Sequence, residues 1–401
     1  MPDASSLRPD LSPWHDSHCL YREWRLVKSG RRELVAENYA THTSHPFSFG
    51  YQKLPGSPVA LDTLDRPQCM KTYELDVAVT RGEETESEHR VHAAVVGERD
   101  ELVGVARDPD AFTYWRSCAK PFQVIPFLSS GGFDSLGWGD EQLAVACASH
   151  GGEPEHVAIV ERMLHDIGLE EGDLACGPHE PSSQRGAKIL RETNGRPSRL
   201  HNNCSGKHSA MLAMAQQKGW PTRGYERREH TVQRTILQEI ALWTGVPCGK
   251  IIQAVDGCGV VVFGMTLERM ARAYSRFAIA AERGEEYPRR VVNAMSKHPF
   301  LVGGTDRFDS ALICETKGRV VSKVGAEGVH CALLPERGLG IAIKVEDGAQ
   351  RAQVPALLRL LQELGALPDQ LPPKLSEWMH KPVKNTRGEC VGEVTLRADV
   401  A

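Results

Sequence analysis

The sequence lacks a long apolar run, although 41% of its 401 residues are hydrophobic. A helix that spans a bilayer needs about 18 consecutive apolar residues, and no stretch approaches that length. The first residues also lack the basic and then apolar pattern of a secretory signal. We therefore expect a soluble, cytoplasmic protein with no membrane partner. Its length is enough for one large domain or two closely packed ones.

The sequence has no excess of charge of one sign, since 48 Lys and Arg residues stand against 52 Asp and Glu residues. The two signs are mixed along the chain. A nucleic-acid surface would need a basic run or patch. We therefore expect no nucleic-acid partner.

A CxxC pair is also missing, although the chain contains 11 cysteines. They are odd in number and widely scattered, which is typical of reduced thiols in a cytosolic protein rather than of a disulfide framework. No standard zinc ribbon is encoded. Any metal site must combine residues from distant segments.

Residues 1–69 differ from the rest, because Pro, Ser, His and Arg are dispersed there without a sustained helical or strand period. A strand-like pattern begins at Met70. We predict an N-terminal extension over 1–69 and a catalytic domain over 70–401. The extension is either loosely ordered or packed on the core, or translation starts at Met70.

Hydrophobic periodicity predicts secondary structure over most of 70–401. Strands are expected at 75–80, 91–96, 101–105, 251–256, 259–263, 311–314, 319–323, 339–345 and 390–397. Helices are expected at 141–149, 154–167, 206–218, 228–244, 265–283, 287–297 and 355–364, and 80–87 is expected to be a polar turn. Because strands open and close this part of the chain while helices fill its middle, we predict an α/β fold of the α+β type. An antiparallel sheet would be flanked by helices, with an adjoining helical region.

The segment RSCAKP at 116–121 contains a serine and a lysine three residues apart. In a helical turn these positions are neighbours, so Lys120 would lie beside the Ser117 hydroxyl. Pro121 indicates the start of a helix. A serine activated by a lysine is a known arrangement for acyl transfer. The alternative is a capping serine followed by a solvated lysine.

Two polar turns contain candidate metal ligands. Residues 201–208, with the sequence HNNCSGKH, lack the glycine spacing of a phosphate-binding loop. Cys204 and His208, four residues apart, together with Cys258, form a set of side chains that zinc accepts. The alternative is that both cysteines are buried, inert thiols.

Two further segments provide a second hydroxyl and a second amine. Ser149 follows a predicted helix and is either a polar cap or a proton relay beside Ser117. Lys323 ends a predicted strand before a glycine-rich turn. This pattern is similar to the Lys-Thr-Gly element that accompanies Ser-x-x-Lys in penicillin-recognising enzymes. Two lysines that converge on two serines would favour the neutral, basic form of an amine.

Taken together, these segments resemble the rhizobial-type, or class 3, L-asparaginase family. The resemblance rests on residues 80–82, 116–121, 148–150, 201–208, 256–259, 303–308 and 323–328. It extends from about Met70 to the C-terminus. It implies a fold similar to serine β-lactamases and glutaminases, a homodimer, and an amidohydrolase that converts L-asparagine to L-aspartate and ammonia.

The resemblance also implies catalytic roles. Ser117 matches the nucleophile and Lys120 the lysine of the first Ser–Lys pair. Ser149 and Lys323 match the second pair.

Substrate and metal contacts are implied in the same way. Arg116, Asp256 and His208 are expected at the substrate site, where the acid at 256 would pair with the substrate's α-ammonium group. Cys204, Lys207 and Cys258 match residues that hold a zinc ion. This zinc is expected to shape or gate the site rather than to generate the nucleophile.

Three other classes stay open at this point. They are a zinc-dependent amidohydrolase, a penicillin-recognising serine enzyme, and a binding protein on an old enzyme fold. The chain shows no Ser-Asp-Asn element, which counts against the second class. The preference for asparagine or glutamine is also open.

Overall fold

The computed structural model describes residues 24–26, 32–34 and 70–400. The extension predicted over 1–69 otherwise lies outside the described residues. Two short strands there, β1 (Trp24–Leu26) and β2 (Arg32–Leu34), pair antiparallel. The chain divides into two units, Met1–Leu64 and Asp65–Ala401, and everything below concerns the second. None of the helices in the described residues combines the length and apolar character needed to cross a membrane.

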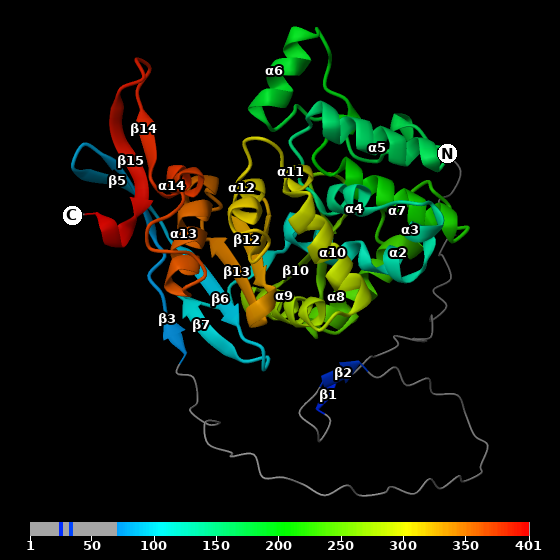
Figure 1. The fold of residues 1–401 in the computed structure, drawn as a ribbon, viewed down its shortest axis with the longest axis horizontal. Coiled ribbons are helices and arrows are strands. Elements are labelled where there is room, and N and C mark those ends of the chain that lie inside the picture. Colours follow the sequence, from blue (N-terminus) through cyan, green and yellow to red (C-terminus); the bar gives the residue numbers. More distant parts are fainter. Residues whose placement is uncertain (1–23, 27–31, 35–69, 401) are drawn as a thin grey trace, which may run out of the picture. The chain divides into compact units, whose positions relative to one another are not determined.

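A six-stranded sheet forms the centre of this unit (Figure 1). Its strand order is β11–β12–β13–β6–β7–β3, and neighbours are antiparallel except for the parallel edge strand β3. The bounds are β3 (Lys71–Thr72), β6 (Val91–Val96), β7 (Leu102–Ala106), β11 (Val321–Val324), β12 (Val329–Leu334) and β13 (Leu339–Val345).

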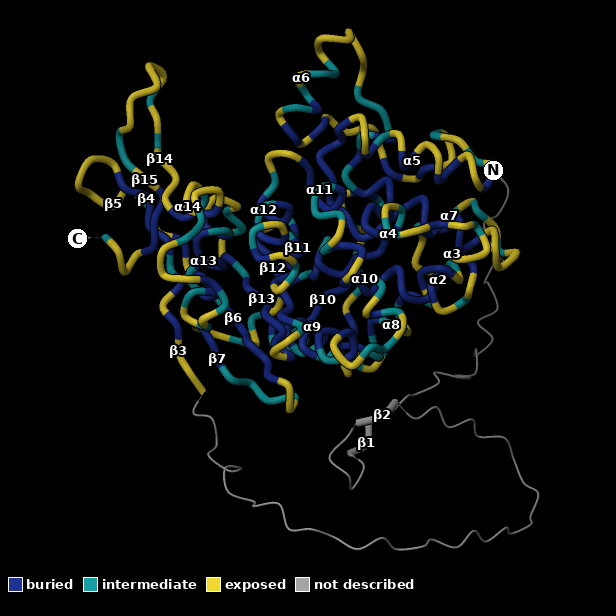
Figure 2. The backbone as a smooth tube through the Cα atoms, viewed as in Figure 1, coloured by how far each residue is buried: buried dark blue, intermediate teal, exposed yellow. Residues whose placement is uncertain are grey.

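Helices cover both faces of this sheet. Side chains alternate along a strand, so Ala93 and Val95 of β6 enter one apolar core while Ala94 and Val96 enter the other. Helix α9 (Leu267–Glu282) packs on one face and α13 (Gln350–Glu363) on the other. The central strands are consequently buried on both sides (Figure 2).

Two smaller sheets flank the centre. A four-stranded sheet has the order β14–β15–β4–β5, and a three-stranded sheet has the order β8–β10–β9. Their bounds are β4 (Val77–Arg81), β5 (Glu84–His89), β14 (Lys381–Lys384) and β15 (Cys390–Leu396), then β8 (Phe112–Tyr114), β9 (Ile252–Val255) and β10 (Val261–Thr266).

The middle of the chain forms a helical region beside the main sheet (Figure 1). A 3-10 turn, Arg116–Ala119, leads into its first helix. The helices are α1 (Lys120–Gln123), α2 (Ile125–Ser129), α3 (Gly132–Ser135), α4 (Asp140–Cys147), α5 (Pro154–Asp166), α6 (Gln184–Glu192), α7 (Ser205–Gln217), α8 (Thr231–Thr244), α10 (Glu286–Lys297), α11 (Pro299–Val302) and α12 (Phe308–Glu315). Helix α14 (Pro373–Met379) packs against α12 and α13.

This architecture confirms the predicted α+β fold, with an antiparallel sheet, flanking helices and an adjoining helical region. Two local predictions were wrong. The strand predicted at 311–314 is part of α12, because a short apolar run does not distinguish a buried strand from a buried helix. Most of the polar turn predicted at 80–87 belongs to β4 and to the exposed strand β5, whose backbone pairs with β4.

Candidate active site

The side chains of Lys120 and Lys323 meet at the hydroxyl of Ser149. The Lys323 Nζ lies 2.8 Å and the Lys120 Nζ 3.1 Å from the Ser149 Oγ. All three residues are at most 3% exposed. Since Ser149 and Lys323 are 174 residues apart in sequence, only the fold brings them together.

Ser149 follows α4, as the sequence predicts, and is fixed by its neighbours. Its N–H donates to the Val302 carbonyl at 3.1 Å. The buried carboxylate of Glu153 accepts hydrogen bonds from the Thr305 N–H and hydroxyl, both at 2.7 Å. These contacts hold the loop after α11 against the segment that carries Ser149.

Lys323 belongs to β11, the edge strand of the main sheet, and its amine is buried. Its Nζ also donates to the Val324 carbonyl at 2.9 Å and lies 3.9 Å from the Asp309 Oδ2. Burial lowers the pKa of Lys323 to about 8; Asp309 acts against this shift and Lys120 acts with it. Part of the Lys323 population is therefore neutral near physiological pH.

Ser117 lies in the 3-10 turn directly before α1, so the prediction of a helix start is confirmed, with Pro121 in the first turn. It is half-buried, and its hydroxyl makes no hydrogen bond to any described residue. Lys120 instead donates to Ser149 and to two carbonyls, those of Ala148 and of Asn203, the latter at 3.2 Å. The Ser117 hydroxyl is free to rotate.

Arg116 and Asp256 form an ion pair next to Ser117. The Arg116 Nε donates to the Asp256 Oδ1 at 2.7 Å, and the two side chains are 22% and 10% exposed. Burial raises the pKa of Asp256, but the charges of Lys207 and Arg116 outweigh it and hold this pKa below its usual value. Arg116 also has a positive φ of 52°, in a region that non-glycine residues rarely adopt.

The three predicted zinc ligands also lie together. Cys204 immediately precedes α7, Lys207 lies in its first turn, and Cys258 lies in the β9–β10 turn. The Lys207 Nζ is 3.2 Å from the Cys258 Sγ. A hydrogen bond from Cys204 lowers the pKa of Cys258 to about 5, against the effect of burial and with the help of Lys207. The same hydrogen bond, together with burial, raises the pKa of Cys204 to about 12.

These residues suit a zinc ion of mixed ligation, with two thiolates and one amine. Cysteine, histidine and carboxylate side chains alone form no metal site of three or more groups within the described residues. A three-ligand site at Cys204 and Cys258 therefore needs Lys207 as its third ligand.

His208 is fully buried and directly follows Lys207 in α7. Its Nδ1 lies 2.6 Å from the Tyr225 hydroxyl, and its Nε2 has no partner in the described part of the chain. Burial lowers the pKa of His208 to about 3, with the Lys207 charge acting in the same direction. The ring is thus neutral at physiological pH.

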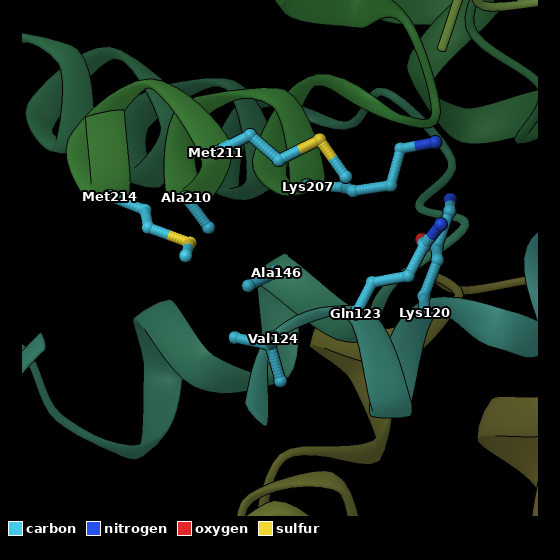
Figure 3. Close-up of a pocket in the computed structure, with 8 residues that line it drawn as sticks. All are labelled: Lys120, Gln123, Val124, Ala146, Lys207, Ala210, Met211 and Met214. Atoms are coloured by element: carbon cyan, nitrogen blue, oxygen red, sulfur yellow. The ribbon is translucent and has the colours of Figure 1, made fainter. Parts of the chain in front are cut away.

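A small pocket is lined by Lys120, which contacts Ser149, and by Lys207 of the candidate metal site. Figure 3 shows the polar ends of Lys120, Gln123 and Lys207 together on one side of it. The other lining residues are Val124, Ala146, Ala210, Met211 and Met214. Its volume is about 10 Å³, which is too small for an amino acid.

Sequence reasoning missed Asp309, Glu153 and Tyr225. Asp309 directly follows the 303–308 segment, but the strand wrongly predicted at 311–314 concealed its place on α12. Glu153 closes the ASHGGE segment that carries Ser149, which was a usable signal. No sequence pattern pointed to Tyr225.

A buried serine that contacts two lysine amines, on a mixed α/β fold, is typical of enzymes that cleave amide bonds. The class indicated is the amidohydrolases. The sequence model of the L-asparaginase II family matches residues 77–396. The chain therefore belongs to the L-asparaginase II family, which confirms the resemblance found in its sequence. No curated protein matches the chain.

Several solved structures are distantly similar. Mglu in its native form is 16% identical, with a TM-score of 0.40, over 69% of this chain and 65% of that one, so the match spans less than two thirds of Mglu. A beta-lactamase from Mycobacterium bovis is 12% identical, with a TM-score of 0.36, over 68% and 94%. A Bacillus glutaminase is 14% identical, with a TM-score of 0.30, over 69% and 91%. TM-scores below 0.5 are too low to support an argument about this chain.

Proposed function

We propose that the protein is an L-asparaginase, which hydrolyses the side-chain amide of L-asparagine to L-aspartate and ammonia. Family membership supports the reaction type. The observation that carries the proposal is the buried Ser149 hydroxyl with the amines of Lys120 and Lys323 both in hydrogen-bond range. Such an arrangement can move protons out of contact with bulk water.

In the proposed mechanism, the Ser117 oxygen attacks the amide carbon and Lys120 takes its proton. The carbon–nitrogen bond breaks as Ser149, coupled to Lys323, gives a proton to the departing ammonia. Water then hydrolyses the Ser117 ester. The free Ser117 hydroxyl supports this order, because it has no hydrogen bond to lose when it turns toward Lys120.

The contacts of Ser149 also favour a second assignment, in which Ser149 itself is the nucleophile. Both amines hydrogen-bond to its oxygen, whereas neither hydrogen-bonds to the Ser117 hydroxyl. Ser117 is the more accessible hydroxyl, since Ser149 is only 3% exposed. Labelling the acylated residue separates the two assignments.

The Arg116–Asp256 pair is the proposed recognition site for the amino-acid part of the substrate. A free amino acid carries a carboxylate and an ammonium group, which an arginine and an aspartate can bind. His208 is fully buried, so we propose that it acts on the substrate site through packing beside Lys207.

We further propose that Cys204, Lys207 and Cys258 hold zinc. Bound there, zinc would shape or gate the substrate site rather than generate the nucleophile. Lys207 and Cys258 already contact each other, and Asp256 lies two residues before Cys258. This chain's residues therefore link the proposed metal site to the substrate site. A homodimer in the cytoplasm stays a prediction.

The test is ammonia release by the purified full-length protein with L-asparagine and with L-glutamine, each with and without added zinc. We expect turnover of asparagine that Ser117→Ala abolishes. No turnover of either amide would refute the proposal. Loss of all turnover on chelation with a fully active Ser117→Ala would select the zinc hydrolase, and covalent labelling by a penicillin would select the penicillin-recognising class.

A further inference from the structure

Asp309 is the carboxylate nearest to the site's amines, and sequence reasoning gave it no role. It is the second residue of α12 and is 3% exposed. Its Oδ2 lies 3.9 Å from the Lys323 Nζ, and no other described carboxylate forms an ion pair with Lys120 or Lys323. A buried carboxylate in this place has either an electrostatic or a positional task.

Within the described residues, the hydrogen bonds and ion pairs of the Asp309 carboxylate come from β11 and β12 of the main sheet. Its Oδ1 accepts a hydrogen bond from the Ser322 hydroxyl at 2.6 Å and faces the His330 Nε2 at 2.8 Å. Its Oδ2 accepts one from the Val324 N–H at 2.8 Å. Residues 322 and 324 flank Lys323 on both sides, so the carboxylate fixes the backbone that carries this amine.

The donors also fix the charge of Asp309. Burial raises the pKa of Asp309, but His330, Lys323 and the Ser322 hydroxyl outweigh it and hold this pKa well below its usual value. The His330 Nε2 must carry a hydrogen, since an ionised carboxylate has none to donate. Asp309 therefore presents a permanent negative charge to Lys323.

We propose that Asp309 is a positioning residue that holds Lys323 against Ser149 and supplies the counter-charge of this amine. The proposal rests on the proposed function, because only that function assigns Lys323 a role in catalysis. Asp309 contacts neither Ser117 nor Ser149. It acts on the reaction only through the lysine.

Other groups also bear on Lys323. Lys120 from α1 and Arg307 from the loop before α12 disfavour its charged form. Cys118 from the 3-10 turn favours it, while His330 from β12 and Cys147 at the end of α4 lie in the same buried cluster. Asp309 is the only one of these groups that combines a carboxylate charge with an ion-pair distance to the amine.

Asp309→Asn removes the charge at nearly constant shape. The Lys323 amine then loses its proton more easily, so its titration should move to lower pH by at least about one unit. The fall of kcat/KM on the acid side of its pH profile should move to lower pH by a similar amount. We also expect kcat to fall at least about tenfold because the amine is less well held, while KM changes less than about threefold.

Ser322→Ala should shift the titration of Lys323 in the opposite direction. It removes the donor at 2.6 Å and keeps the charge, so the carboxylate interacts more strongly with Lys323 and the titration should move to higher pH. Asp309→Glu keeps the negative charge, so the acid side of the pH profile of kcat/KM should stay near its wild-type position. Asp100→Asn is the matched control: Asp100 pairs with Arg272 and Arg276 in the β6–β7 turn, and its loss should leave the pH profile unchanged.

The titration is measured directly by NMR of lysine 13Cε-labelled full-length protein, with the Lys323 signal assigned by its absence in Lys323→Met. This readout needs no turnover, so it stays valid if neither amide is a substrate and the proposed function fails. Unchanged Lys323 titration in both Asp309→Asn and Ser322→Ala would overturn the proposal. If Asp309→Asn does not fold, Ser322→Ala alone tests the proposal: a Lys323 titration at higher pH supports it, and an unchanged titration overturns it.

Discussion

Replacing Ser149 and Ser117 separately by alanine should separate stability from activity. Ser149→Ala removes the oxygen that accepts hydrogen bonds from Lys120 and Lys323. Each amine is then left with an unused buried N–H, which costs about 1–3 kcal/mol. For the two amines together, we therefore expect the free energy of unfolding to fall by about 2–6 kcal/mol.

The same substitution at Ser117 should cost almost no stability, because its hydroxyl has no hydrogen bond within the described residues. We expect a change within about 0.5 kcal/mol. At about 2 °C for each kcal/mol in a unit of this size, Ser149→Ala should melt roughly 4–12 °C below the wild type and Ser117→Ala within about 1 °C of it. Ammonia release should fall by at least about 10³-fold in both variants.

Circular dichroism melts and the ammonia assay measure the two effects. Ser275→Ala is the matched control, since the hydroxyl of this buried serine lies 2.9 and 2.8 Å from the Gly97 and Gly338 carbonyl oxygens, outside the site, and can donate to either. It should lose stability and keep full activity. An unaltered melt of Ser149→Ala, or wild-type turnover by Ser117→Ala, would refute the reasoning. Mass spectrometry after reaction with a diazoketone analogue of asparagine, which loses N2 and alkylates a reactive hydroxyl, identifies the modified serine.

Three further outcomes are expected. The value of kcat/KM should rise about tenfold between pH 7 and pH 9. The pair of amines can accept a proton from a serine only after one amine has lost its own proton, and the pKa of Lys323 is about 8. A flat profile of kcat/KM over this range would contradict this reasoning. Lys120→Met should abolish ammonia release while near-ultraviolet circular dichroism stays unchanged, and residual wild-type turnover would argue against its role. Cys258→Ser should reduce zinc content by metal analysis and raise KM several-fold, whereas a collapse of soluble yield would favour a purely structural thiol.

The sequence predicted the architecture better than it predicted the site. Element order alone indicated the α+β fold, because patterns of period 2 and 3.6 survive without knowledge of distant contacts. Strand β5 was missed since its sequence, ETESEH, has no apolar alternation and only its backbone pairs with β4. The helix at 308–315 was missed because the apolar run 311–313 fits either element.

Within the site, prediction from the sequence was limited by how far apart the interacting residues lie along the chain. The Ser117–Lys120 spacing is local and readable, yet the observed contact of Lys120 is with Ser149, 29 residues away. Lys323 was placed in the site by the similarity of its strand end to a Lys-Thr-Gly element and by the family resemblance, not by any local spacing to Ser149. Asp309 could not be assigned, because its role depends on which strand lies beside α12.

The counter-charges of the three buried lysines support different roles for them. Lys207 contacts Cys258, whose lowered pKa makes it an anion, and Lys323 lies 3.9 Å from Asp309. Lys120 contacts only neutral oxygens in the described part of the chain. A buried anion without a partner is costly, so each of these anions favours the charged form of its lysine. Lys120 can exchange a proton with Ser117 without leaving a carboxylate or thiolate unpaired, and this freedom is what its proposed role as the general base for Ser117 requires.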